Sequence, residues 1–251
     1  TRHELVAYFQ PQVSCVDSSV KGFEALMRWR HPILGLVSPA QFIPLAENNG
    51  QIVSMGSWML KEACMQAIRW QEYQPPGAPL LRIAVNVSLR QFADVNLVRD
   101  VQVALESSGL HPQQLELEIT EGTAMLDMQR TMDLLRQFKS MGLQLAIDDF
   151  GTGYSSLAYL KRFPLDVLKI DQSFIRQICS DKDDRAIAAA ILSLAHSLQL
   201  KVIAEGVETE EQHTLLTEMG CDEIQGYLHG RPMPSDDLQV WMHEKYRHKA
   251  L

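Results

Sequence analysis

Apolar runs of the length of one β-strand alternate along the whole chain with stretches that have the periodicity of an amphipathic helix. The chain has 251 residues, a length that suits one large barrel. The expected strands cover residues 6–13, 22–29, 81–88, 115–120, 144–149, 167–171, 201–206 and 223–228. This alternation predicts an α/β fold, specifically a TIM-like (β/α)8 barrel.

The connection between the first two expected strands is the exception to this pattern. Residues 14–21 are too few for a helical crossover, which two parallel strands require. We therefore expect a hairpin that leaves the first strand antiparallel to the rest. An open doubly wound sheet is the alternative, but the chain lacks the Gly-x-Gly-x-x-Gly turn that often accompanies that fold.

Helical signals fill the longer connections. Residues 39–48 and 52–73 read as two helices between the second and third strands, and Thr209-Glu210-Glu211-Gln212 reads as a capping box. No stretch has the composition of an interdomain linker, so we expect one domain over residues 1–251. The chain opens at Thr1 without a methionine, which we read as a domain excised from a longer multidomain protein.

Composition narrows the possible partners. The net charge of −8 argues against a surface that binds a DNA or RNA duplex. The longest strongly apolar stretch, residues 186–195, is too short to span a bilayer, and no signal peptide is visible. The four scattered cysteines suit reduced core thiols. We therefore expect a cytoplasmic domain that makes no membrane contact.

Polar and charged residues gather where the expected strands end. Because the carboxyl ends of parallel strands meet at one mouth of a barrel, these side chains should converge. Glu24 and Arg28 lie on the second strand, and the other residues of the set are Asn86, Glu118, Glu121, Asp148, Asp149, Lys169, Asp171, Glu205, Glu208 and Gln225. Burying so many carboxylates together would be strongly unfavourable without cations.

The chemistry of this set points to hard metal ions. Carboxylate and amide oxygens without Cys or His suit Mg²⁺ or Mn²⁺. Two such ions bridged by a carboxylate can generate hydroxide and stabilise the displacement at a phosphodiester. Arg28 and Lys169 are the cations best placed to meet phosphate oxygens.

Several of these residues also have structural interpretations. Glu121 and Glu208, just past their strands, could be charges at helix N-termini. Lys169 could pair with Asp171, and Glu116, one pleat repeat before Glu118, could have a purely structural role.

The motifs, taken in order, resemble those of the EAL domain family, the cyclic di-GMP phosphodiesterases of bacterial signalling. The segment Glu24-Ala25-Leu26 matches the triplet that names the family. The resemblance continues through Leu36-Val37-Ser38-Pro39, Asn86-Val87-Ser88, Glu116 to Glu121, Asp148 to Ser156, Leu168-Lys169-Ile170-Asp171, Ala204 to Glu210 and Gln225-Gly226-Tyr227. Departures are small: Phe9 stands where the family usually has Tyr, and Gly230 precedes Arg231-Pro232.

The resemblance implies a role for each site residue. Glu24, Asn86, Glu118 and Asp148 would hold one ion, and Asp148 would bridge to a second that Asp149 and Glu205 also bind. Lys169 would contact the attacking water or a phosphate oxygen, and Gln10, Arg28, Gln225 and Pro232 would lie on the substrate side. Glu121 would anchor the glycine-rich loop after Asp149, and Glu208 would complete the catalytic set.

The resemblance also implies a reaction and partners. With two Mg²⁺ or Mn²⁺ ions per site, the domain would open cyclic di-GMP to linear pGpG. A binding module without useful turnover, or a different phosphodiester substrate, are the alternatives. We expect a homodimer packed partly through a helix at residues 155–162, with an upstream sensory or GGDEF domain possible.

Overall fold

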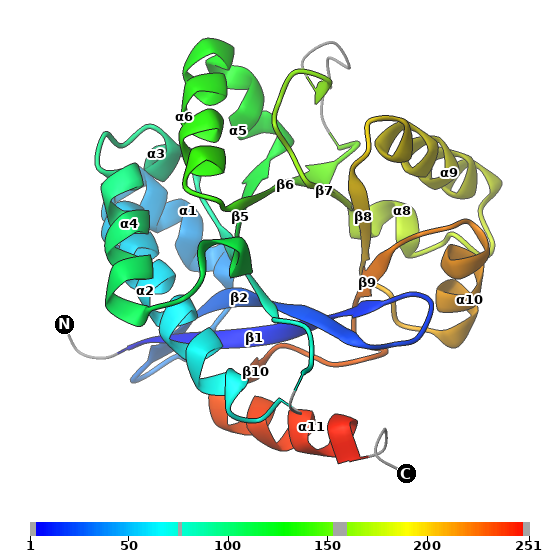
Figure 1. Ribbon diagram of the computed structural model, residues 1–251, viewed down its shortest axis with the longest axis horizontal. Coiled ribbons are helices and arrows are strands. Elements are labelled where there is room, and N and C mark those ends of the chain that lie inside the picture. The colour runs from blue at the N-terminus through cyan, green and yellow to red at the C-terminus, as the bar shows by residue number, and fades with distance from the viewer. Residues whose placement is uncertain (1–3, 75–76, 153–159, 248–251) are drawn as a thin grey trace.

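The hairpin between β1 (Leu5–Ser14) and β2 (Val20–His31) decides how the sheet closes. The two strands pair antiparallel from Leu5 opposite Trp29 to Val13 opposite Val20. β1 also pairs antiparallel with β9 (Glu223–Gln225), the last strand of the parallel series. The sheet therefore joins its own end, and the computed structural model, which describes residues 4–74, 77–152 and 160–247, is a closed barrel (Figure 1). The predicted barrel with an antiparallel first strand is confirmed, and the open sheet is wrong.

The barrel strands follow one another around the ring in the order β1-β9-β8-β7-β6-β5-β4-β2. All neighbouring pairs except those of β1 are parallel. The remaining strands of the ring are β4 (Arg82–Asn86), β5 (Leu115–Thr120), β6 (Gln144–Phe150), β7 (Val167–Ile170) and β8 (Lys201–Glu205). These strands match the expected ones to within a few residues at each end.

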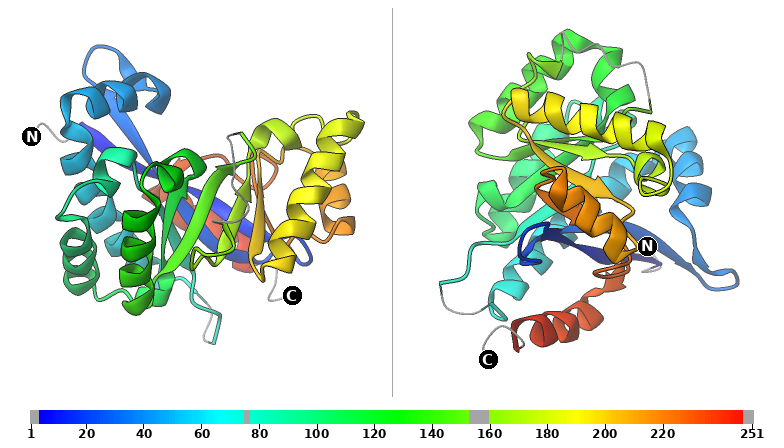
Figure 2. Two further views of the ribbon diagram at one scale, coloured as in Figure 1. Left: turned by 90° about the horizontal axis from the view of Figure 1, so that it is seen from above. Right: turned by 90° about the vertical axis from the view of Figure 1, so that its right-hand side faces the viewer.

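Two short strands extend the ring beyond what the sequence indicated. β3 (Gly35–Val37) folds back on the end of β2, and β10 (Met233–Pro234) pairs with Tyr8 and Phe9 of β1. Both are too short to leave a periodic signal in the sequence. The β2–β3 hairpin projects beyond the barrel together with α1 (Figure 2).

Helices surround the barrel (Figure 1). They are α1 (Pro39–Asn49), α2 (Gln51–Gln71), α3 (Leu89–Phe92), α4 (Leu97–Ser108), the 3-10 turn η1 (Pro112–Gln114), α5 (Glu121–Leu126), α6 (Met128–Ser140), α8 (Gln172–Ile175), α9 (Lys182–Ser197), α10 (Glu210–Glu218) and α11 (Ser235–Arg247). The capping box expected at Thr209 and Gln212 is present at the start of α10. The predicted helix at residues 155–162 lies mostly outside the described residues.

The apolar core lies between the strands and this outer layer of helices. Trp70 of α2 is almost fully buried and meets the ring edges of Phe9 and Phe23 at centroid distances of 4.6 and 5.0 Å. Each such edge-to-face pair adds about 0.5–1.5 kcal/mol to the area that it buries. No helix within the described part of the chain is long and apolar enough to cross a membrane.

Candidate active site

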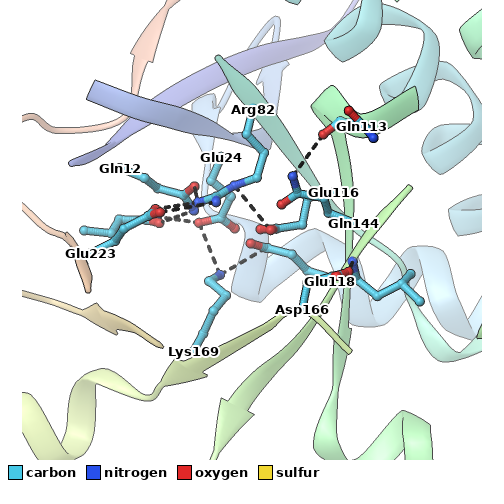
Figure 3. Close-up of polar contacts among 12 residues, drawn as sticks. Gln12, Glu24, Arg82, Gln113, Glu116, Glu118, Gln144, Asp166, Lys169 and Glu223 are labelled. Atoms are coloured by element: carbon cyan, nitrogen blue, oxygen red, sulfur yellow. Dashed lines mark hydrogen bonds and ion pairs between the residues drawn. The ribbon is translucent and has the colours of Figure 1, made fainter. Parts of the chain in front are cut away.

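Four of the predicted site residues lie at matching positions of neighbouring strands at one mouth of the barrel. Strand register places Asn86 beside Glu118 and Glu205 beside Gln225. Alternate residues of a strand point to the same face, so Glu116 and Glu118 both face the interior of the barrel. The two residues belong to two different polar layers: an upper layer at the mouth, around Lys169, and a lower layer deeper in the barrel, around Arg82 (Figure 3, in whose orientation Lys169 is drawn below Arg82).

Lys169 occupies the centre of the upper layer. Its side chain is fully buried, and its Nζ lies 2.7 Å from Glu205 Oε1, 3.0 Å from Glu118 Oε2, 3.2 Å from Asp148 Oδ1 and 3.7 Å from Glu24 Oε2. These carboxylates outweigh the cost of burying the ammonium and raise the pKa of Lys169 well above its usual value. The lysine is therefore charged.

The alternative pairing of Lys169 with Asp171 is wrong. Asp171 caps α8 instead, where its Oδ1 accepts hydrogen bonds from the backbone N–H and the hydroxyl of Ser173. The two residues therefore have different roles: Lys169 points into the barrel, and Asp171 begins the next helix.

Glu24 is held at both oxygens by amide donors. Asn86 Nδ2 donates to Glu24 Oε1 at 2.6 Å, and Gln225 Nε2 donates to Glu24 Oε2 at 2.5 Å. Because Asn86 uses its nitrogen on Glu24, its carbonyl oxygen is the atom left to face a cation. Burial opposes the charge on Glu24, but Lys169 and then the two amides outweigh it and lower the pKa of the carboxyl.

A bulge brings the two adjacent aspartates to the same side. Neighbouring strand residues normally face opposite ways. The β6–β7 register shifts between Ile147 and Phe150, and Asp149 adopts a left-handed backbone with φ of 53°. The Asp149 N–H donates to Asp148 Oδ1 at 2.9 Å and supports this turn. Left-handed conformations of non-glycine residues are unfavourable and cluster at functional sites.

This geometry can hold divalent cations. One carboxylate oxygen from each of Asp148, Asp149 and Glu205 lies within 4.8 Å of the others. Glu24 and Glu118 bring the number of carboxylates around the single ammonium of Lys169 to five. The surplus of negative charge in a buried place and the all-oxygen donors fit Mg²⁺ or Mn²⁺.

Without a cation, protons take up part of this surplus. Burial first, and then the charge of Asp148, raise the pKa of Asp149 to about 6. Burial likewise raises the pKa of Glu118 well above its usual value, although the charge of Lys169 opposes the shift. The pKa of Glu205 is raised for the same reason. Protons and cations would therefore compete for these carboxylates.

A second polar layer lies below the first and was not foreseen. Arg82 at the start of β4 is buried, with its Nε 3.2 Å from Glu116 Oε2 and its Nη2 2.7 Å from Glu223 Oε2. Arg82 Nη2 also donates to Gln12 Oε1 at 2.7 Å (Figure 3). Glu116 therefore has the structural role considered for it. The available sequence signal was one further polar or charged residue in each of the four strands β1, β4, β5 and β9.

The two glutamates just past their strands lie in different surroundings. Glu121 is buried at the start of α5, and its Oε2 accepts the expected hydrogen bond from the Gly151 N–H at 3.2 Å. Glu208 is exposed, and its backbone N–H donates to Gln212 Oε1 in the turn that begins α10. The position of Glu208 suits the helix N-terminal interpretation, and its catalytic role stays a prediction.

The expected substrate-side residues lie along β1, β2 and the segment after β9. Gln10 accepts from Gln225 Nε2 at 3.1 Å and donates to the Gly230 carbonyl at 3.1 Å. Arg28 is partly buried, and its guanidinium lies 5.7 Å from the ring centroid of Tyr8. Pro232 directly precedes β10, which pairs with β1. Tyr227 is exposed, and the Cζ of Arg231 lies over its ring at 4.0 Å from the centroid.

Comparison with known proteins identifies what this architecture resembles. The family model described as "EAL domain" matches residues 1–232. A relative from Pseudomonas aeruginosa, named bifunctional diguanylate cyclase/cyclic di-GMP phosphodiesterase MucR, is 49% identical over 237 residues, which are 94% of this chain and 34% of that protein. The chain thus spans about a third of the length of that relative.

Two solved structures match both the fold and the sequence. One, described as a c-di-GMP complex of the PaMucR phosphodiesterase, has a TM-score of 0.90 at 49% identity and covers 94% of this chain and 95% of that one. The other, a manganese and cyclic di-GMP complex of Klebsiella pneumoniae BlrP1, has a TM-score of 0.80 at 28% identity and covers 93% of this chain and 57% of that one.

Proposed function

The chain belongs to the EAL domain family, and from that premise we propose that it hydrolyses cyclic di-GMP to linear pGpG in a cation-dependent reaction that lowers a bacterial second messenger. The observation that carries this proposal is the buried group of carboxylates around Lys169 at the barrel mouth. Such a group suits the handling of a phosphodiester with bound cations and has little use as a purely structural element.

We propose that two cations share this mouth. Glu24, Asn86, Glu118 and Asp148 would hold the first, and Asp148, Asp149 and Glu205 would hold the second. When bound, Mg²⁺ or Mn²⁺ supplies Lewis acidity, which lowers the pKa of water and offsets charge on the phosphate. Support comes from the 4.8 Å clustering of the last three carboxylates and from the two amide donors that hold Glu24.

The cationic residues would contact the attacking water and the phosphates, and the substrate-side residues would line the ligand. Lys169 is charged and would donate a hydrogen bond to the attacking water or to a phosphate oxygen, with a carboxylate beside it to set its direction. Arg28 would meet the second phosphate through its fork of donors. Gln10, Gln225 and Pro232 would line the ligand, because β1 and the segment 226–232 form one side of the mouth.

We also propose that residues 1–251 form one domain of a longer cytoplasmic protein that acts as a homodimer, with a sensory or GGDEF domain upstream. The helix α11 lies beyond the family match, yet its Leu238 and Met242 are buried in the common core. The side chain of Trp241 meets Phe23 at a centroid distance of 6.2 Å. These contacts support a domain that extends through α11.

The reaction is tested by incubating the protein with cyclic di-GMP and either Mg²⁺ or Mn²⁺ and separating the products chromatographically. We expect linear pGpG, and we expect it to disappear with chelator and in Glu118→Gln. That substitution keeps the shape of a side chain beside Lys169 but removes a carboxylate. If the protein binds cyclic di-GMP without converting it, the hydrolase proposal is refuted and a binding module is left.

A further inference from the structure

Three glutamine side chains form a continuous line of hydrogen bonds from the lower polar layer to the mouth of the barrel. Arg82 Nη2 donates to Gln12 Oε1 at 2.7 Å, and Gln12 Nε2 donates to Gln225 Oε1 at 2.9 Å. Gln225 Nε2 then donates to Glu24 Oε2 at 2.5 Å and to Gln10 Oε1 at 3.1 Å. Every member of this line is buried.

The orientation of each amide in this line is fixed, because the group at one end can only donate hydrogen bonds and the group at the other end can only accept them. A guanidinium can only donate, whereas an ionised carboxylate can only accept. Arg82 therefore holds the oxygen of Gln12 and leaves its nitrogen to face Gln225. Gln225 must then offer its oxygen to Gln12 and its nitrogen to Glu24. A 180° rotation of the Gln12 amide would place its nitrogen against the Arg82 guanidinium and its oxygen against the Gln225 oxygen. A 180° rotation of the Gln225 amide would place nitrogen against nitrogen at Gln12 and oxygen against oxygen at Glu24 and Gln10.

The donor end of the line is itself held firmly. Arg82 is paired with Glu116 and Glu223 at 3.2 and 2.7 Å, so its guanidinium is locked in the plane that reaches Gln12 (Figure 3). The acceptor end is Glu24, the carboxylate of β2 that faces Lys169. Gln12 is fully buried and connects the two layers through its amide.

We propose that Gln12 is a positioning residue for the cation site, and that Arg82 sets the orientation in which it acts. Through Gln225, this line keeps one oxygen of Glu24 occupied by a donor, while Asn86 engages the other. The carboxylate is thereby held at the angle from which it faces the centre of the mouth. This inference rests on the cation site of the proposed function but not on the identity of the substrate.

A purely structural role for Gln12 makes a different prediction from a positioning role. If Gln12 only satisfies Arg82, glutamate at this position should be at least as good, because it accepts from the guanidinium with a full charge. If Gln12 must donate to Gln225, glutamate is the worst choice, because it turns an acceptor toward the Gln225 oxygen. Methionine, which has a similar length, should have an intermediate effect, because it neither donates a hydrogen bond to Gln225 nor places a charged acceptor against the Gln225 oxygen.

The test is a titration of Mn²⁺ into metal-free protein by calorimetry, without substrate, for wild type, Gln12→Met and Gln12→Glu. We expect Gln12→Met to bind about fivefold more weakly, as the loss of one buried hydrogen bond implies, and Gln12→Glu more than tenfold more weakly despite its added negative charge. The matched controls are Gln114→Met and Gln114→Glu. Gln114 is equally buried but donates to the Leu81 carbonyl, away from the mouth.

Each outcome decides the proposal. The proposal is overturned if the Gln12→Glu protein binds Mn²⁺ as tightly as the Gln12→Met protein, or if both variants bind it as tightly as wild type. It is also overturned if the wild-type protein does not bind Mn²⁺. If Gln12→Met fails to fold, Arg82→Lys is the second probe, because it keeps a charge beside Glu116 but shortens the reach to Gln12, and the same loss is expected. If the affinity order holds while cyclic di-GMP is not cleaved, the positioning role stands and the proposed reaction falls.

Discussion

Replacing Lys169 with methionine should destabilise the cation-free protein and abolish most turnover. The substitution keeps the length of the side chain but removes the charge that lies within 3.7 Å of four carboxylates. Removing one partner of a buried ionic group costs about 3–5 kcal/mol. We expect the lower end of this range, because Glu118, whose pKa is already raised by burial, can take up a proton.

The loss is measurable as a change in unfolding temperature. For a domain of this size, 1 kcal/mol corresponds to about 2–4 °C, so a loss of about 3 kcal/mol predicts a decrease of roughly 6–12 °C in chelator. Mn²⁺ should restore more of the unfolding temperature in the variant than in wild type, because the cation compensates the same carboxylates. Turnover should fall about 10²–10³-fold, as for the loss of a group that stabilises developing charge.

The matched control is Lys139→Met. Lys139 Nζ lies 2.7 Å from Asp166, as close as Lys169 to Glu205, but both side chains of the Lys139 pair are a third exposed. Such a pair contributes less than about 1 kcal/mol. Calorimetric unfolding in chelator compares the two variants. Equal stability of Lys169→Met and Lys139→Met, or near wild-type turnover of the first, would refute the reasoning.

Four further outcomes are expected. Mn²⁺ affinity, followed by calorimetry from pH 8 to pH 5, should fall throughout this range, because protons compete first for Glu205, whose pKa is raised to about 8, and then for Asp149, whose pKa is raised to about 6, and Asp149→Asn should remove the part of the fall near pH 6. Glu121→Ala should weaken Mn²⁺ binding about tenfold, since Gly151 loses a charge-assisted hydrogen bond, and an unchanged titration would remove that bond from the site. Gly226→Ala should lower the unfolding temperature, measured calorimetrically, because its Cβ would lie 2.0 Å from the Val207 carbonyl oxygen. Ca²⁺ should not replace Mg²⁺ in the pGpG assay, because its longer bonds misplace the reacting groups, and equal rates would contradict this.

The eight barrel strands and the carboxylates at their ends could be predicted because both signals are local. A strand appears in the sequence as an apolar run, and a residue at its carboxyl end must face the mouth once the strands are parallel. The length of the first connection likewise determined that β1 runs antiparallel, since eight residues cannot form a crossover. The sequence alone therefore predicts that Glu118, Asp148 and Glu205 lie at the mouth of the barrel.

Tertiary structure alone decided which of these side chains meet. The sequence left Lys169 with a choice between Asp171 and the interior, and only closure of the barrel put it among Glu118, Asp148 and Glu205. The bulge that turns Asp149 toward Asp148 depends on the register of β6 against β7, which the sequence does not encode locally.

The lower polar layer shows the same limit. Arg82, Glu116, Glu223 and Gln12 come from four strands that are widely separated along the chain. Nothing in the local sequence relates these four residues to one another, and only the shear of a closed barrel brings them to one height. The sequence thus determined the chemistry of the site, through the residue types at the strand ends. The closed sheet determined how the charges inside the barrel pair, because a contact between distant strands depends on register and not on local pattern.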